Sequence, residues 1–231
     1  MKNETNIEYR RFILSMIPPA FILLIIWLVK IVELAGGLEL YYYGILPRKI
    51  SGLAGIFAAP FIHSGFNHLI NNTVPFFFLL TAIFYFYQKV AWRVLFYSYI
   101  LTGILVWLVA RSSYHIGASG LIYSFASFLF TSGIIRRNIN LLAISLLVIF
   151  LYGSMVWGIF PYMPEMSWES HLMGLLTGVG LSFNYRHEGP GPTKFISDME
   201  EEEEEESEEE ERGESEESRE ENDRHCEEQE V

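Results

Sequence analysis

Apolar runs, each close to the length that crosses a lipid bilayer, recur six times along this chain. A helix needs about 20 apolar residues to cross roughly 30 Å of hydrocarbon. The runs lie near 12–31, 69–87, 91–110, 119–135, 141–158 and 169–185. The fourth and sixth are short or contain polar residues, as expected of helices surrounded by other helices. The sequence therefore predicts an all-α, polytopic membrane protein with a bundle of six transmembrane helices.

The chain ends in an acidic segment whose composition differs from that of the rest. Residues 198–231 hold 21 of the 28 acidic residues but three of the 16 basic ones, so residues 1–197 carry a net charge of +6 although the whole chain carries −12. Because a run of like charge with few aliphatic residues cannot bury enough surface to fold, we expect a disordered acidic tail over 188–231, with a docking or regulatory role as the alternative. The predicted domains are thus an N-terminal segment (1–11), a membrane domain (12–187) and this tail. Cys226, the only cysteine, lies in the tail, so no intramolecular disulfide is expected.

Basic residues in the short loops predict the orientation, because lysine and arginine stay preferentially on the cytoplasmic side. Six helices put both termini on the same side of the membrane. The basic residues on that side are Lys2, Arg10, Arg11, Lys89, Arg93, Arg136, Arg137 and Arg186, and those on the opposite side are Lys30, Arg48, Lys49 and Arg111. We therefore expect cytoplasmic termini and a multi-pass protein of the plasma (inner) membrane. The first run follows two arginines and shows no small-residue cleavage pattern, which predicts a retained helix rather than a signal peptide. The starts of the second, fourth and sixth helices then share the outer face.

A first polar cluster stands at the start of the second predicted helix, in His63-Ser64-Gly65-Phe66-Asn67-His68-Leu69-Ile70-Asn71-Asn72. His68 and Asn72 are four residues apart, so on a helix they share a face and can direct an imidazole and an amide to one point. Such donors suit an oxyanion, whose charge develops as a peptide carbonyl is attacked. The alternative role for the pair is hydrogen bonding between helices.

A second cluster, Gly117-Ala118-Ser119-Gly120, lies where a loop meets the fourth predicted helix. Glycine lets the backbone turn sharply and lets another helix approach closely. If Ser119 begins the helix, its backbone N–H is free to join the His68 and Asn72 donors. Tyr123 follows four residues later on the same face, where its ring could support an imidazole. The alternative is a serine N-cap with packing glycines and a packing aromatic ring.

The third cluster is His171-Leu172-Met173-Gly174-Leu175-Leu176-Thr177-Gly178. Gly174 and Gly178 form a stripe of small residues that favours close helix packing, and this stripe directs His171 toward a neighbouring helix. A serine hydroxyl becomes a good nucleophile when a base within hydrogen-bond reach removes its proton, and a neutral histidine does this near pH 7. The alternative to a catalytic role is that His171 is a structural histidine of the helical bundle. Donors, nucleophile and base at three helix starts on one side together favour a catalytic site.

Composition excludes an aspartate as the third member of a catalytic triad, because Asp198 and Asp223 are the only aspartates and both lie in the tail. Glu169 precedes His171 by two residues, roughly on the opposite side of a helix, and Glu165 lies in the preceding loop. We therefore expect a Ser-His dyad whose histidine is oriented by packing or by Tyr123.

The same residues argue against metal and aspartyl chemistry. An intramembrane aspartyl protease needs aspartates in the membrane, and a zinc protease needs His-Glu-x-x-His, which does not occur. No spacing among the histidines at 63, 68, 115 and 171 predicts a metal site.

In number and order, these clusters resemble the motifs of the rhomboid intramembrane serine proteases over most of residues 40–186. The matching patterns are His-x4-His-x3-Asn, Gly-x-Ser-Gly and His-x2-Gly-x3-Gly, carried by His63, His68, Asn72, Gly117, Ser119, Gly120, His171, Gly174 and Gly178. The resemblance implies that Ser119 is the nucleophile and His171 the general base. It also implies that His68, Asn72 and the Ser119 backbone N–H form the oxyanion hole. Tyr123 matches the tyrosine that stacks on the catalytic histidine, whereas His63 has a more structural role.

The implied activity is that of a basic six-helix rhomboid, an endopeptidase that cleaves transmembrane segments of single-pass or other membrane proteins. It needs the lipid bilayer, no cofactor and no nucleic acid, and its site opens to the outer face. The alternative in the same family is a pseudoprotease that binds transmembrane clients without cleavage. A transporter that relays protons through its histidines is a third hypothesis, against which the scarcity of membrane acids counts.

Two loops qualify this resemblance. Tyr41-Tyr42-Tyr43-Gly44-Ile45-Leu46-Pro47-Arg48-Lys49 stands in the first outer loop, where many rhomboids carry a Trp-Arg pair, and this puts the packing of that loop in doubt. Phe160-Pro161-Tyr162-Met163-Pro164, before the last helix, is predicted to cap the site and to open for substrate.

Overall fold

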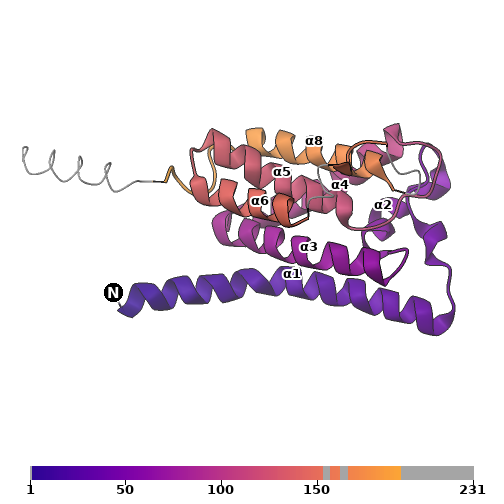
Figure 1. Ribbon diagram of the computed structural model, residues 1–231, viewed down its shortest axis with the longest axis horizontal. Helices are drawn as coiled ribbons and strands as arrows, with labels where there is room; N and C mark the ends of the chain where they lie inside the picture. Colours follow the sequence, from indigo (N-terminus) through magenta and orange to yellow (C-terminus); the bar gives the residue numbers. More distant parts are fainter. Residues whose placement is uncertain (1, 153–156, 162–165, 194–231) are drawn as a thin grey trace, which may run out of the picture. The chain divides into compact units, whose positions relative to one another are not determined.

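The computed structural model describes residues 2–152, 157–161 and 166–193, which form a helical bundle (Figure 1). Its α-helices are α1 (Lys2–Gly36), α2 (Gly55–Ala58), α3 (Phe66–Phe86), α4 (Ala91–Val109), α5 (Ser119–Ile135), α6 (Ile139–Leu151) and α8 (Trp168–Asn184). Three 3-10 helices, η1 (Leu40–Tyr43), η2 (Ile50–Gly52) and η3 (Ala59–Phe61), lie between α1 and α3. Across these described ranges the one β-type pairing is an isolated antiparallel bridge between Ile45 and His115. The prediction of an all-α protein is confirmed.

Three helices, α1, α3 and α4, are long and apolar enough to cross a membrane. Shorter apolar helices cover 50–61, Ser119–Ile135 and Ile139–Leu151. The predicted runs agree with the observed helices to within a few residues, with two exceptions: α1 extends from Lys2 to Gly36 and so includes most of the predicted N-terminal segment 1–11, and α6 ends at Leu151. The count of six spans stays a prediction, because the fifth run includes residues 153–156, which lie outside the described ranges.

Helix α1 lies along α3, and polar bonds join the two at several levels (Figure 1). Near the start of α1, Arg11 Nη2 donates to the carbonyl of Tyr85 at 2.7 Å. Farther along, Trp27 Nε1 donates to Thr73 Oγ1 at 3.1 Å. Each bond pairs a polar group that would otherwise face an apolar interface, and so both fix the register of α1 on α3.

Helix α5 lies at the centre of the bundle. It packs against α3, α4 and α6, and most closely against α8. Its buried residues face every direction. This explains why the side chains on every face of the helix are small or apolar, so that the helix is not amphipathic. Phe125, Phe128 and Leu129 on α5 form the core together with Leu69 and Phe76 on α3. The start of α5 is therefore anchored by surrounding helices.

The first outer loop is tied to the segment that leads into α5. Ile45 and His115 exchange two backbone hydrogen bonds, each 2.9 Å long. Arg48 Nη1 donates to the carbonyl of Ala110 at 2.6 Å, and Trp107 Nε1 donates to the carbonyl of Lys49 at 2.9 Å. In this chain, an arginine and a tryptophan from different segments thus hold the loop whose packing the sequence put in doubt.

Residues up to 192 belong to one compact unit of the structure. The predicted acidic tail lies outside the described residues from 194 onward. The last part of this unit is fixed by Arg136, whose Nη1 and Nη2 donate to the carbonyls of Arg186 and Gly189 at 2.7 and 2.9 Å. The first residues of the predicted tail, as far as Gly189, are thus held on the bundle.

Candidate active site

Ser119 and His171 form a direct hydrogen bond between α5 and α8. Ser119 is the first residue of α5, and His171 lies one turn into α8. Ser119 Oγ lies 2.8 Å from His171 Nε2. The imidazole is buried and the hydroxyl half-buried. A nucleophile and a base predicted from separate motifs are therefore within proton-transfer distance.

The other nitrogen of His171 has a backbone partner. Nδ1 lies 2.8 Å from the carbonyl oxygen of Gly158. Because a carbonyl can only accept, Nδ1 carries the proton and Nε2 presents its lone pair to the Ser119 hydroxyl. This is the tautomer that a general base requires. A backbone carbonyl thus stands where a triad would place a carboxylate.

Tyr123 fixes the plane of the imidazole. Its ring stacks on His171 with centroids 4.3 Å apart and an interplanar angle of 11°. Tyr123 lies one turn after Ser119 on α5, so one helix supplies both the hydroxyl and the stacking surface. The imidazole is held by this ring and by the Gly158 carbonyl together.

Three glycines allow the close approach of α5 and α8 that this bond needs. A Cβ on Gly178 would lie 2.1 Å from the carbonyl oxygen of Ser124, and one on Gly120 would lie 3.1 Å from the carbonyl oxygen of Ser170. Gly174 lies still closer to α5. The stripe predicted from the sequence is therefore the contact surface between the two helices.

The side chains predicted as oxyanion donors lie beside Gly117. A Cβ on that residue would lie 2.9 Å from His68 Nε2 and 3.7 Å from Asn72 Nδ2. Gly117 also has a φ of +104°, in the region that favours glycine. The turn before Ser119 thus brings the backbone against both donors, and His68 and Asn72 share a face of α3 as their spacing predicts.

His63 supports this pair from behind. Its Nε2 accepts a hydrogen bond of 3.0 Å from Asn72 Nδ2, and its ring packs edge-on to that of His68 with centroids 5.0 Å apart. Burial, together with the nearby His68 and Lys30, lowers the pKa of His63 to about 3. A neutral imidazole keeps the Nε2 lone pair available to Asn72.

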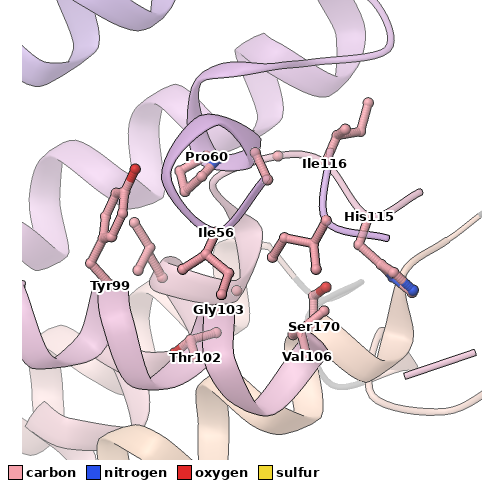
Figure 2. A pocket seen from close by; sticks show the side chains of 14 residues that line it. Ile56, Pro60, Tyr99, Thr102, Gly103, Val106, His115, Ile116 and Ser170 are labelled. Atoms are coloured by element: carbon pink, nitrogen blue, oxygen red, sulfur yellow. The ribbon is translucent and has the colours of Figure 1, made fainter. Parts of the chain in front are cut away.

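A small cavity of about 30 Å³ lies on the α4 side of the serine turn (Figure 2). It is lined by residues of the first outer loop, α4 and the serine turn, among them Pro60, Tyr99, Thr102, His115 and Gly120. The Oγ1 atom of Thr102 is buried and has no hydrogen-bond partner among the described residues. A space of this size holds about one or two waters, each needing polar partners of this kind.

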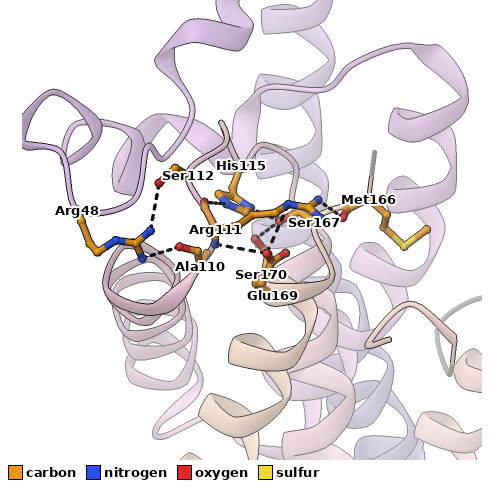
Figure 3. A network of polar contacts seen from close by, with 9 residues as sticks. All are labelled: Arg48, Ala110, Arg111, Ser112, His115, Met166, Ser167, Glu169 and Ser170. Atoms are coloured by element: carbon orange, nitrogen blue, oxygen red, sulfur yellow. Dashed lines mark hydrogen bonds and ion pairs between the residues drawn. The ribbon is translucent and has the colours of Figure 1, made fainter. Parts of the chain in front are cut away.

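A polar network joins the segment before Ser119 to the start of α8 (Figure 3). His115 Nε2 donates to the carbonyl of Arg111 at 3.1 Å, and its Nδ1 accepts from the hydroxyl of Ser167. Arg111 also forms an ion pair of 3.5 Å with Glu169 Oε1, where the Glu169 side chain is only 6% exposed. Glu169 is therefore directed at Arg111 and not at His171, which agrees with its predicted place on the helix.

Three further predictions concern His115, a metal site and the capping loop. His115 belongs to the network above, apart from the cluster of the other three histidines. In the described ranges, no group of three or more His, Cys, Asp or Glu side chains could hold a metal ion. Of the predicted capping loop 160–164, residues 162–164 lie outside the described residues.

Comparison with known sequences agrees with this geometry. A sequence model of the Rhomboid domain matches residues 51–188. The chain belongs to the rhomboid family. This membership and the apolar helices make it an integral membrane protein. The match begins after α1 and contains every predicted site residue.

Two mycobacterial relatives show how far the similarity extends. An uncharacterized protein of Mycobacterium tuberculosis (strain ATCC 25618 / H37Rv) is 33% identical over 171 residues, which cover 67% of this chain and 68% of that protein. An uncharacterized protein of Mycobacterium leprae (strain TN) is 31% identical over 195 residues, covering 77% of this chain and 74% of that protein. The similarity thus extends over most of both proteins.

Two features of the site escaped the sequence analysis. The Gly158 carbonyl has no sequence signal, because every residue carries one. Lys30, which donates to the carbonyl of His63 at 2.8 Å, did carry a signal, a lysine inside an apolar run. An ionisable residue at that depth usually faces the bundle interior and marks a working part of it.

Proposed function

We propose that this rhomboid is an intramembrane serine endopeptidase that uses a Ser119–His171 dyad. One observation carries the proposal: Ser119 Oγ lies 2.8 Å from His171 Nε2 while the Gly158 carbonyl holds the proton on Nδ1. A serine and a histidine that met only for packing would not need this tautomer.

The reaction follows from this geometry. The Ser119 hydroxyl attacks a peptide carbonyl as its proton moves to His171 Nε2. The carbonyl oxygen becomes an anion that the Ser119 backbone N–H, the His68 imidazole and the Asn72 amide can stabilise. Loss of one such donor typically lowers kcat by about 10²–10³-fold. His171 then gives its proton to the leaving amine, and an acyl-enzyme remains.

Hydrolysis of the acyl-enzyme needs water at a depth where the surroundings are apolar. The cavity lined by Gly117, Gly120 and Thr102 offers about 30 Å³ and the Thr102 hydroxyl, which has no hydrogen-bond partner among the described residues (Figure 2). In the proposed second step, His171 removes a proton from a water, and the water attacks the acyl carbonyl. The bond between the acyl carbon and Ser119 Oγ then breaks, and His171 Nε2 returns the proton to Oγ, so the free serine is restored without any cofactor.

The proposed substrates are transmembrane segments of single-pass or other membrane proteins. A helical peptide hides its carbonyls in its own hydrogen-bond ladder, so the segment must unwind before it reaches Ser119. Helix-breaking residues and small side chains near the cut favour this unwinding. In this proposal the termini are cytoplasmic, the protein resides in the plasma membrane, and the site opens to the outer face.

The test is covalent labelling of the reconstituted protein by a fluorophosphonate or isocoumarin probe, with cleavage of a model transmembrane substrate measured in the same vesicles. We expect labelling and cleavage by wild type and by the loop control Ser113→Ala, and neither by Ser119→Ala or His171→Ala. A wild-type protein that neither labels nor cleaves contradicts the proposal, and binding of transmembrane clients without cleavage then becomes the function to test.

A further inference from the structure

Lys30 is a charged group buried in an otherwise apolar part of α1. The residue is 5% exposed. Its Nζ forms an ion pair of 2.7 Å with Glu33 Oε2 one turn later, and the two side chains are 6% and 12% exposed. A charge withdrawn from water is unfavourable unless partners compensate it, so such a residue usually has a specific task.

The second partner of Lys30 lies in the segment that leads into α3. Its Nζ donates to the carbonyl oxygen of His63 at 2.8 Å. His63 lies between η3, which ends at Phe61, and α3, which begins at Phe66. Its carbonyl is therefore outside the hydrogen-bond ladder of either helix. Lys30 thus holds in place a peptide carbonyl that belongs to no helix.

The side chain of that same residue contacts both proposed oxyanion donors. His63 Nε2 accepts from Asn72 Nδ2 at 3.0 Å, and the His63 ring lies edge-on to His68, with centroids 5.0 Å apart. The position of the His63 backbone sets where its ring stands. A shift at the carbonyl therefore moves the amide of Asn72 and the imidazole of His68 together.

We propose that Lys30 is a positioning residue for the oxyanion site, acting from α1 through the backbone and ring of His63 on Asn72. This inference rests on the proposed protease function. It gives α1, which lies outside the matched residues 51–188, a part in the chemistry of residues on α3 and α5. Lys30 does not itself contact the reacting atoms.

A double-mutant cycle with Asn72 tests this inference. Glu33→Gln serves as the reference background, because removing Lys30 alone would leave a buried carboxylate without its partner. In that background, Lys30→Met removes the bond to His63, together with any hydrogen bond from Lys30 to the amide that Glu33→Gln introduces, and leaves no buried carboxylate without a partner. We expect kcat to fall about 10-fold or more with KM within about threefold, because a misplaced donor weakens transition-state binding more than substrate binding.

The cycle separates positioning from general destabilisation. In an Asn72→Ala background, which lacks the donor that is hydrogen-bonded to His63, we expect the same Lys30→Met change to lower kcat by a smaller factor, because only the contact with His68 then remains. Trp27→Phe, which removes another bond between α1 and α3, is the matched control and should leave kcat within about twofold. Lys30→Arg, which retains a charged donor, should recover part of the loss. If Lys30→Met prevents folding, Lys30→Gln in the same background provides the same comparison.

Three outcomes overturn the inference while the proposed function stands. The first is an active protein whose kcat is unchanged by Lys30→Met in the Glu33→Gln background. The second is a kcat loss of the same factor with and without Asn72, and the third is an equal loss in Trp27→Phe. A wild type that neither labels nor cleaves overturns the proposed function, and with it this inference.

Discussion

Gly174 on α8 lies directly against the backbone of Gly120 on α5, and a Cβ on Gly174 would lie 2.0 Å from the Gly120 carbonyl oxygen. No side chain fits there without moving one helix. Gly120 follows Ser119, and Gly174 lies one turn after His171, so this contact fixes the separation of the proposed nucleophile and the proposed base. The 2.8 Å hydrogen bond between Ser119 and His171 therefore depends on the packing of Gly120 against Gly174.

Gly174→Ala is therefore expected to push α8 away from α5. A displacement of about 1 Å at the reacting groups can lower the rate about 10²-fold. We predict a loss of cleavage of that order, together with a lower Tm. Gly180→Ala on the same helix is the matched control, since a Cβ there would meet nothing within 4 Å. Equal activity of the two variants would contradict this account of the helix contact.

Gly117→Ala tests the turn in front of the serine. Gly117 has a φ of +104°, and a Cβ would lie 2.8 Å from His68 Cε1. Alanine at such a φ is strained by about 1–2 kcal/mol and would push the His68 ring away. We predict at least a 100-fold loss of kcat with a smaller change in KM, measured on a transmembrane substrate.

Gly65→Ala provides the comparison for Gly117→Ala. It lies at the start of α3, in extended backbone with a φ of −167°, and a Cβ there would meet nothing within 4 Å. We expect this variant to retain most of the wild-type activity. Loss of activity in Gly65→Ala but not in Gly117→Ala would contradict the prediction that the turn at Gly117 is needed to hold the His68 ring in place.

The sequence predicted much of the site because its residues lie in short motifs with fixed spacing. His68 and Asn72 share a face of α3 because four residues make about one helical turn. Tyr123 stacks on His171 because it lies one turn after Ser119. Within such motifs, local geometry determines which side chains can meet.

The partners that the sequence could not predict belong to other parts of the chain. Gly158 contributes a backbone carbonyl, which carries no residue-specific signal. Lys30 reaches His63 across 33 residues of sequence, so the contact depends on how α1 docks. The helices themselves were predictable from hydrophobic length. The short helices η1, η2, α2 and η3 have no clear hydrophobic periodicity; α2 packs against α4, and η3 packs against α1 and α5.

Acid is expected to destabilise the fold through His63. Its pKa is about 3 in the folded protein, against about 6.5 when unfolded, so below pH 6.5 the unfolded state binds the proton that the folded state excludes. The stabilisation is complete above pH 6.5 and is lost as the pH falls toward 3. Burial also lowers the pKa of His115, which acts in the same direction.

Between pH 6.5 and pH 5 the expected loss from His63 is about 2 kcal/mol of unfolding free energy. Unfolding in detergent at several pH values measures the effect. His63→Gln, whose amide oxygen can still accept from Asn72, should show a smaller pH dependence. A wild-type stability that is constant or rises toward pH 5 would refute the assignment.

Arg48 is expected to stabilise the first outer loop, although this loop lacks the Trp-Arg pair of many rhomboids. Its guanidinium donates to the carbonyl of Ala110 at 2.6 Å and to Ser112 Oγ at 3.2 Å, at the start of the segment that leads to Ser119 (Figure 3). A hydrogen bond from a charged donor contributes about 1.5–3 kcal/mol. We predict that Arg48→Leu lowers the Tm by several degrees and lowers kcat, because the Ile45–His115 pairing in the same loop leads directly into the serine turn.

Lys49→Leu is the control for Arg48→Leu, since Lys49 accepts from Trp107 through its backbone carbonyl and its side chain is exposed. The same Tm and kcat in both variants would mean that the backbone pairing alone holds the loop.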